Sequence, residues 1–268
     1  MKLTLRPATD SDREAVCALC IRLDPRDYLP DAWRAWLASP ENEMLLAHRG
    51  EALIGCVFSA LVAPGQVFSQ GLRVHPDYHR LGVGTLLMHE QRRRLKERKI
   101  RTAFGVTGAN NRRARTFFRT VGWNELAIVH RRRLPQWTKS GAAAASSASF
   151  PDDLLVSREG LAHFRRIYFS ADARWLEQAS SEGRWHARDG AHVLLDPPSA
   201  EFGTWVVALG GKPASFGALL SELSPPWSGP RGLTVESADR PEIQSVLDGL
   251  GFHPPERESS YVVVECRI

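Results

Sequence analysis

The stretch LRVHPDYHRLGVGTLLMHEQRRR, residues 72–94, joins a β-branched strand to a long helix. The strand ends at Val74, a turn containing Pro76 follows, and Gly82 and Gly84 open the helix. Because glycine has no Cβ, a ligand or another backbone segment can approach closely at both positions. The first turn of a helix leaves amide N–H groups unpaired, and the aligned peptide dipoles add a partial positive charge there. The stretch therefore predicts a phosphate-binding helix N-terminus.

The spacing inside this stretch makes the prediction more specific, because Gly-x-Gly alone occurs in many proteins. Residues 74–84 read Val-x4-His-x2-Gly-Val-Gly. This pattern resembles the pyrophosphate-binding motif Gln/Arg-x-x-Gly-x-Gly/Ala of the GCN5-related N-acetyltransferase (GNAT) family, with His79 where Gln or Arg is usual. Residues 111–123 resemble a second family segment, Asn-x-x-Ala-x-x-Phe-Tyr-x-x-x-Gly-Phe. The resemblance covers about residues 2–134.

The resemblance implies an α/β (α+β) fold, in which a mixed central sheet is flanked by helices, and acetyl-CoA as the co-substrate. It also implies a splayed strand whose backbone pairs with the pantetheine arm, and Gly71 suits the bulge that opens such a strand. One amide of this strand, with that of Val74 as the first candidate, would stabilise the oxyanion. Residues 79–85 would hold the pyrophosphate, and Asn111 would contact the cofactor arm. The implied cofactor-binding residues are Leu72, Arg73, Val74, His79, Arg80, Leu81, Gly82, Val83, Gly84, Thr85 and Asn111.

Hydrophobic periodicity predicts alternating strands and helices over the first half of the chain. We expect a capping box formed by Ser11 and Glu14 to open the first helix, and a tight turn at 48–51 to join two strands as a hairpin. Strands are expected at 2–8, 44–48, 52–62, 67–74, 102–106 and 123–129, and helices from Ser11, around Trp33 and Trp36, at 82–98 and at 111–121.

Residues 138–150, TKSGAAAASSASF, suit a linker, which predicts domains at 1–137 and 151–268. We expect the second domain to repeat the first in shortened form, because residues 205–223 align with the two strands at 44–62. No strand–Gly-x-Gly–helix unit follows. The expectation is a tandem arrangement with a degenerate GNAT-like second domain that lacks the pyrophosphate loop. That domain would pack on the first as a pseudo-dimer partner within one chain and help to wall the acceptor pocket.

No residue of the sequence can be assigned as the catalytic acid or base. Phe118 stands where the family often has the tyrosine that protonates the leaving thiolate, although a thiol is acidic enough for water to suffice. The strand at 67–74 contains no carboxylate, so ordered water is an alternative base. The acceptor region offers the carboxylates Asp27, Asp31, Glu41 and Glu43 and the aromatic residues Tyr28, Trp33 and Trp36, for which surface exposure and core packing are the simpler interpretations.

A basic block spans residues 79–139, where sixteen Lys or Arg stand against three acids. Four of its arginines either serve the cofactor phosphates or are simply solvated: Arg80, Arg112, Arg113 and Arg115. The block overlaps the cofactor motif and carries no DNA- or RNA-binding signature, so nucleic acid is not the expected partner.

Hydrophobic residues make up 43% of the chain and charged residues 24%, as in ordinary globular proteins. The chain has no apolar run long enough to span a membrane or to act as a signal peptide, so we expect a cytoplasmic protein without a membrane partner. Cys17-x-x-Cys20 lacks a second ligand pair, and we interpret it as two small helix residues rather than as a metal site.

The predicted function is that of an N-acetyltransferase, which transfers an acetyl group from acetyl-CoA to a primary amine of a small molecule or a protein. No cysteine or serine lies in a nucleophilic setting, which favours direct attack in a ternary complex. The alternative is a non-catalytic acyl-CoA-binding module, suggested by Phe118 and by the missing strand carboxylate.

Overall fold

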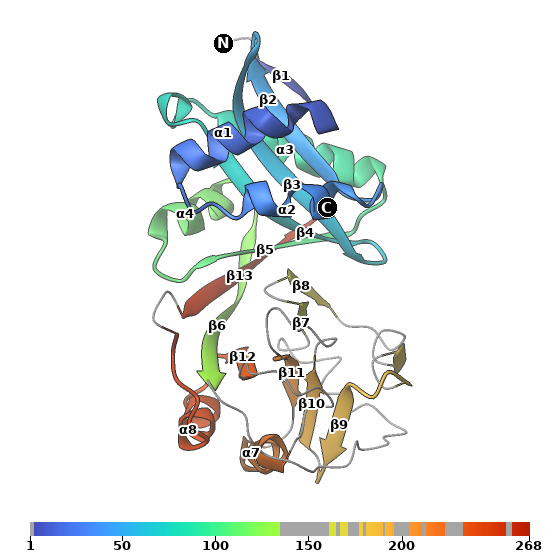
Figure 1. Ribbon diagram of the computed structural model, residues 1–268, viewed down its shortest axis with the longest axis vertical. Helices are drawn as coiled ribbons and strands as arrows, with labels where there is room; N and C mark the ends of the chain where they lie inside the picture. Colours follow the sequence, from blue (N-terminus) through green and yellow to red (C-terminus); the bar gives the residue numbers. More distant parts are fainter. Residues whose placement is uncertain are drawn as a thin grey trace. The chain divides into compact units, whose positions relative to one another are not determined.

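The computed structural model describes residues 3–134, 161–164, 167–170, 177–178, 181–189, 191–195, 204–210, 213–222, 233–255 and 259–268 (Figure 1). The chain divides into two compact units. The first consists of Met1–Gly105, Thr116–Asn124 and Glu265–Ile268, and the second of Val106–Arg115 and Glu125–Val264. The expected linker at 138–150 lies outside the described residues, so the expected domain boundaries stay predictions.

The first half of the chain forms the elements that the hydrophobic pattern predicts, with bounds shifted by a few residues. The strands are β1 (Thr4–Pro7), β2 (Glu43–Arg49), β3 (Ala52–Ala63), β4 (Gln66–Val74), β5 (Thr102–Gly108) and β6 (Asn124–Leu134). The helices are α1 (Arg13–Leu23), α2 (Leu29–Leu37), α3 (Val83–Glu97) and α4 (Arg112–Thr120), with two 3-10 turns, η1 (Asp10–Asp12) and η2 (Pro76–Tyr78).

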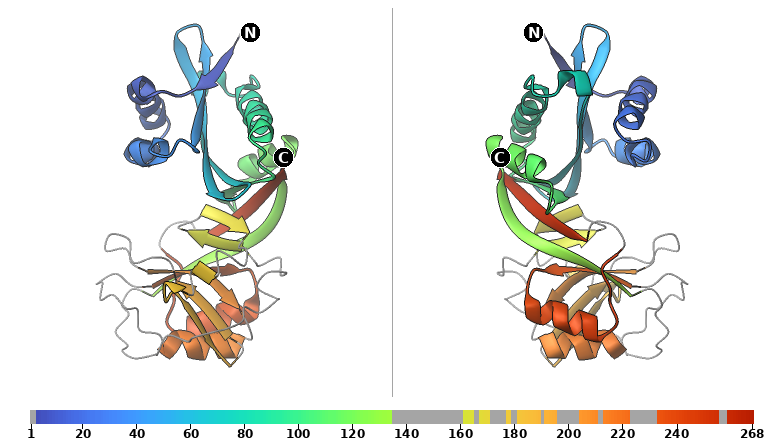
Figure 2. Two further views of the ribbon diagram at one scale, coloured as in Figure 1. Left: turned by 90° about the vertical axis from the view of Figure 1, so that its right-hand side faces the viewer. Right: turned by 90° about the vertical axis from the view of Figure 1, so that its left-hand side faces the viewer.

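The sheet of the first unit has the order β1-β2-β3-β4-β5. Its strands are antiparallel except β4 and β5, which are parallel and joined by α3. In Figure 2, α1 and α2 cover one face of this sheet and α3 covers the other. The mixed sheet flanked by helices is therefore confirmed.

Two local expectations have different outcomes. The hairpin is confirmed, because Arg49 pairs with Ala52 across a turn in which Gly50 has a φ of +57°. The capping box at Ser11 is wrong. The carboxylate that caps the turn belongs to Asp12, which accepts the Thr9 N–H at 2.8 Å and two hydrogen bonds from the guanidinium of Arg6. The bidentate bond from β1 fixes Asp12 in this position, so the chain enters its first helix through η1.

Close packing and a buried polar network hold α3 against the sheet. A Cβ on Gly55 of β3 would lie only 2.9 Å from the Arg73 carbonyl oxygen and 3.0 Å from Cδ1 of Leu87 in α3, so only glycine allows this approach. Gln91, which is buried, donates from Nε2 to Oγ of Ser59 and accepts from Oγ of Ser69, both at 2.9 Å.

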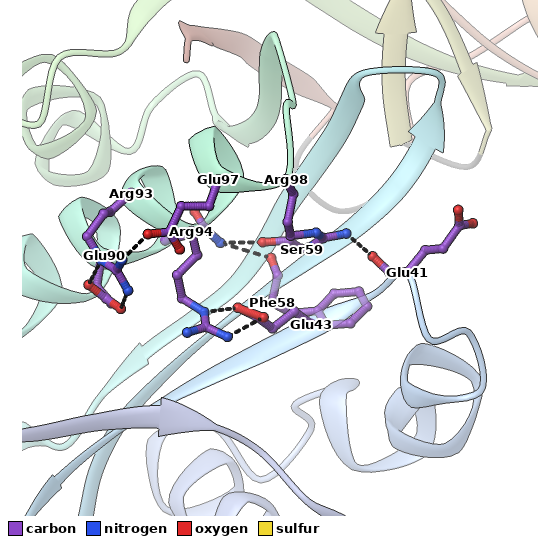
Figure 3. Close-up of polar contacts among 10 residues, drawn as sticks. Glu41, Glu43, Phe58, Ser59, Glu90, Arg93, Arg94, Glu97 and Arg98 are labelled. Atoms are coloured by element: carbon purple, nitrogen blue, oxygen red, sulfur yellow. Dashed lines mark hydrogen bonds and ion pairs between the residues drawn. The ribbon is translucent and has the colours of Figure 1, made fainter.

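An ion pair and a further hydrogen bond complete this attachment (Figure 3). Arg94 reaches Glu43 on β2 through two hydrogen bonds of 2.5 and 2.8 Å. Arg98 donates to the backbone carbonyl of Glu41 in the segment before β2. The position of the α3 N-terminus is thus determined by contacts along most of the helix.

The second unit contains the sheet order β13-β6-β12-β11-β10-β9 and a separate hairpin of β7 and β8. Its further elements are β7 (Leu161–Phe164), β8 (Ile167–Ser170), β9 (Trp185–Arg188), β10 (Ala191–Leu195), β11 (Thr204–Gly210), α7 (Pro213–Glu222), β12 (Leu233–Ala238), α8 (Pro241–Gly249) and β13 (Ser260–Arg267). Strands β9, β10 and β11 are successively antiparallel, and β12 is parallel to β11. The succession β9-β10-β11-α7-β12 has the same pairing directions as β2-β3-β4-α3-β5.

The expected alignment of 205–223 with the strand pair at 44–62 is wrong, because 213–222 is a helix. Gly217, which lies in this helix, allows a close contact between helices. A Cβ there would lie 2.6 Å from Cγ1 of Val246 in α8. None of the helices in the described part of the chain is both long and apolar enough to cross a membrane.

Candidate cofactor-binding site

The N-terminus of α3 presents unpaired amide groups. Gly82 has a φ of +80° and ends the loop in the left-handed region that glycine tolerates. The first backbone bond of the helix runs from Leu86 N–H to the Gly82 carbonyl at 2.9 Å. Within the described residues, no acceptor is paired with the N–H groups of residues 82–85, nor with that of Arg80. Five donors are therefore available to an anion at this helix end.

The loop before the helix is held by its own hydrogen bonds. The Nε2–H of His79 donates to the Val74 carbonyl at 2.8 Å, which also defines the protonated ring nitrogen because a carbonyl can only accept. The His79 N–H is bonded to the Pro76 carbonyl and the Leu81 N–H to that of Tyr78. Of the predicted residues 79–85, His79 and Leu81 thus already use their amides in the fold, and His79 shapes the loop through its ring.

The two glycines have different surroundings. A Cβ on Gly82 would meet no atom within 4 Å, so the space beside this residue is open. A Cβ on Gly84 would lie 3.5 Å from the ring of Phe117 and 3.6 Å from Cγ2 of Val74. Gly82 therefore leaves room for a ligand, whereas Gly84 allows the start of α3 to pack against an aromatic ring.

The bulge expected at Gly71 is confirmed. Cys56 pairs with Arg73 and Phe58 with Gln70, so two residues of β4 lie opposite the single residue Val57. Gly71 has a φ of +66°. On the other edge of β4, pairing with β5 extends only over Gln66–Phe68. The end of β4 is therefore bulged on the edge that faces β3. On its other edge, which we call the released edge, pairing with β5 ends at Phe68. Both features agree with the splayed strand of the prediction.

The amide of Val74 faces the released edge. In an antiparallel ladder, bonded and non-bonded residue pairs alternate. His75 donates its N–H to the Ile54 carbonyl at 2.9 Å, which makes His75 and Ile54 a bonded pair. Val74 lies opposite Gly55 in the next pair, so its N–H and C=O point away from β3. An N–H in this position suits the oxyanion role expected of Val74.

The side of β4 that faces α1 and α2 contains a buried ion pair that the sequence did not reveal. Arg73 donates from Nε and Nη2 to both carboxylate oxygens of Asp27, at 2.6 and 3.1 Å, and the Asp27 side chain is 2% exposed. The guanidinium lies 5.7 Å from the ring centre of Tyr28. Asp27 is thus neither a surface group nor a free base, and Arg73 contributes to the predicted site through its backbone.

The other candidates of the acceptor region are engaged or exposed. Glu43 pairs with Arg94, and Asp31 and Glu41 are exposed. Trp33 is completely buried and packs in the core, as the simpler interpretation has it. Trp36 stacks on Phe58 with ring centres 4.2 Å apart. In this region of the described chain, no carboxylate stands free beside the bulged strand.

Phe118 and Asn111 lie on α4 or just before it. The ring of Phe118 packs 5.4 Å from that of Trp123, so the position usually held by tyrosine has an aromatic packing role. Asn111 belongs to the second unit, where its Oδ1 accepts the Ala114 N–H at 3.0 Å and caps α4. Its expected contact with the cofactor arm stays a prediction.

Within the described residues, five of the sixteen basic side chains in the block pair with acidic partners, and three of these partners lie outside the block. The pairs are Arg93 with Glu90 and Glu97, Arg94 with Glu43, Arg115 with Glu125, Arg131 with Glu236, and Arg132 with Asp248. Of the four arginines assigned either to phosphates or to solvent, Arg115 is therefore engaged by Glu125. The pairing lowers the net charge that this block can offer to a polyanion.

Comparison with known proteins finds a family model that matches the residues around this site. Residues 13–123 match the model of the acetyltransferase (GNAT) family. Over these residues the chain is similar to that family. No curated protein sequence matches the chain. The open helix end, the bulged strand and the released edge fit the diphosphate and the pantetheine arm of acetyl-CoA, the co-substrate of that family.

Solved structures extend the likeness in fold beyond residues 13–123. A putative acetyltransferase from Thermoplasma acidophilum aligns with 99% of this chain and 100% of its own, at a TM-score of 0.62 and 15% identity. A GCN5-related N-acetyltransferase from Sphaerobacter thermophilus aligns over 99% and 95%, at a TM-score of 0.59 and 14% identity. An acetyltransferase from Bacillus subtilis, solved with CoA, covers 48% of this chain and 81% of its own, with a TM-score of 0.42 and 21% identity. At these identities the likeness concerns the fold.

Proposed function

We propose that the GNAT domain transfers an acetyl group from acetyl-CoA to a primary amine of a small molecule or a protein. Two features together carry this proposal. The amides of Arg80 and of residues 82–85 have no acceptor within the described residues, and the N–H of Val74 points away from β3. The amides would hold the diphosphate, and the Val74 N–H would donate to the thioester oxygen as negative charge develops on it.

In this proposal the amine attacks directly in a ternary complex. The amine nitrogen forms the new bond to the carbonyl carbon, the carbon–sulfur bond breaks, and the thiolate leaves with the bonding electrons. The proton lost by the amine goes to water, and the thiolate takes one from water, because Phe118 cannot donate and Asp27 is bound to Arg73. A thiol ionises near pH 8.5, so its thiolate is a good leaving group without a side-chain acid.

The direct test measures free CoA released from acetyl-CoA over a panel of primary amines. Amine-dependent release supports the proposal. If calorimetry detects acetyl-CoA binding and no amine stimulates release, the protein is the acyl-CoA-binding module instead, the second candidate favoured by Phe118 and by the absence of a free carboxylate beside β4 in the described residues. If no binding is detected, both candidates fail.

We further propose that the second unit is a degenerate GNAT-like domain, which makes the chain a tandem pseudo-dimer. The same order of strands and helix supports this, as does the shortened connection before the helix. Only residues 211–212 separate β11 from α7, whereas residues 75–82 separate β4 from α3. This interval in the sequence is too short to hold a phosphate cradle like that of residues 75–82. Calorimetry is therefore expected to give one acetyl-CoA per chain, and a stoichiometry of two would contradict the degenerate assignment.

A further inference from the structure

The end of β4 has lost its partner on one edge, so its position must be set from elsewhere. Beyond Phe68 no pairing with β5 remains, and the bulge at Gly71 interrupts the ladder with β3. A strand end held by few ladder bonds has more freedom than the centre of a sheet. An amide that must point at a developing oxyanion tolerates little of this freedom, because small displacements cost large factors in rate.

The segment between α1 and α2 supplies the missing restraint. Asp27, in this segment, receives two hydrogen bonds from Arg73, and the same guanidinium donates from Nη1 to the Leu72 carbonyl at 3.1 Å. One planar group therefore connects the carboxylate of the helical layer with both the side chain and the backbone of the bulged strand. Burial by itself lowers the pKa of Arg73, but the hydrogen bond and charge of Asp27 outweigh it, so the pKa lies above its usual value.

Aromatic side chains also pack against the bulge and against the Arg73–Asp27 pair. A Cβ on Gly71 would lie 3.2 Å from the Trp36 ring, so α2 covers the bulge directly. Tyr28 bridges the two restraints, because its ring lies 5.8 Å from that of Trp36 and under the guanidinium of Arg73. The bulge and the ion pair are thus parts of one packed cluster.

We infer that Arg73 and Asp27 are a positioning pair, which aligns the Val74 amide by fastening the released end of β4 to the segment before α2. The inference rests on the proposed function, because it concerns the strand that would bind the acetyl-pantetheine part of the co-substrate. The pair touches neither the reacting atoms nor the diphosphate cradle. Its loss should therefore affect binding of the acetyl-pantetheine portion and spare binding of the diphosphate.

Calorimetry with two probes separates these effects in the full-length protein. ADP, which carries the diphosphate without pantetheine, reports on the cradle, and acetyl-CoA reports on the cradle and the strand together. Asp27→Asn leaves Arg73 with a neutral partner, and we expect the acetyl-CoA Kd to rise about tenfold or more while the ADP Kd is unchanged. An unchanged ADP Kd also demonstrates that the variant has folded around the cradle.

Asp12→Asn is the matched control. Asp12 accepts two bonds of 2.6 and 2.8 Å from Arg6, and its pair lies in the same unit but away from β4. This variant is expected to lower the melting temperature and to leave both dissociation constants unchanged. Arg73→Lys is a second variant, which retains the charge opposite Asp27 but loses the planar fork that reaches Leu72. It should also weaken acetyl-CoA binding selectively.

The inference is overturned if Asp27→Asn and Arg73→Lys bind acetyl-CoA as the wild type does. It is equally overturned if both probes weaken in parallel, because the pair would then act only through general stability. If the wild type binds ADP but shows no added affinity for acetyl-CoA, the proposed function fails instead, independently of either variant.

Discussion

Gly82 offers the sharpest test of the helix N-terminus as a diphosphate site. Gly82→Val introduces a branched side chain where a Cβ meets no atom of the protein within 4 Å, so the new methyl groups would occupy only space open to a ligand. Gly50→Val is the matched control, because Gly50 also has a positive φ, +57° against +80°, and also has nothing within 4 Å of its Cβ position. Both variants place a β-branched residue in the left-handed region, at a strain of about 1–2 kcal/mol each.

The expected effects therefore separate stability from binding. The melting temperature should fall by similar amounts in both variants, because both have similar backbone strain. Hydrogen bonds to a charged group contribute about 1.5–3 kcal/mol each, so displacing a diphosphate from two of the five free amides costs about 3 kcal/mol or more. This corresponds to a Kd for acetyl-CoA that is about 100-fold weaker or more in Gly82→Val.

Isothermal calorimetry at one salt concentration measures the difference, with wild type and Gly50→Val side by side. Acetyl-CoA binding to Gly82→Val with the wild-type Kd would refute the assignment of this helix end. Equal weakening in Gly50→Val would also refute it, because the effect would then come from backbone strain and not from obstruction of the site.

Other predictions concern the contacts that hold the site in place. Gly55→Ala should lower the free energy of unfolding by about 1–3 kcal/mol in urea denaturation, because its Cβ would meet the Arg73 carbonyl, whereas Gly249→Ala, with nothing within 4 Å, should not. Gln91→Leu should cost about 1–3 kcal/mol in the same assay, since two buried serine hydroxyls lose their partner; an unchanged midpoint would contradict this. The hydrogen bond from Arg6 holds the pKa of Asp12 below its usual value, so its contribution to stability is complete above pH of about 4 and is lost as the pH falls further. Asp12→Asn should remove that part of the acid dependence measured by thermal unfolding.

The parts of the site that arise from local sequence could be predicted. The loop, the glycine at the start of α3 and the hairpin at Gly50 each depend on a few consecutive residues whose backbone preferences are specific. The bulge at Gly71 was also accessible, because a glycine inside a strand signals an irregular position. By contrast, the Arg73–Asp27 pair joins residues 46 positions apart, and no local sequence pattern predicts that these two residues meet.

Helix α7 shows why the second half was harder to interpret. Its apolar residues with an internal glycine fit a short buried strand as well as a helix, and periodicity alone does not separate the two over ten residues. The deciding fact is tertiary, because Gly217 lets α7 approach Val246 of α8 more closely than any other residue could. The order of strands and helix in the fold matches β11 with β4, whereas the sequence alignment matched it with β2, two strands earlier.

The groups proposed to act on acetyl-CoA are mainly backbone amides, so most substitutions of their side chains leave these groups unchanged. Val74 would act through its N–H, and Arg80 and residues 82–85 through theirs, so exchange of their side chains leaves the donors in place. Side-chain truncation at Val74 or Thr85 should thus change turnover less than a substitution that moves the strand, such as Asp27→Asn. Catalysis in this arrangement depends on where the chain is held, because the donors that would stabilise charge are common to every residue and only their positions are specific.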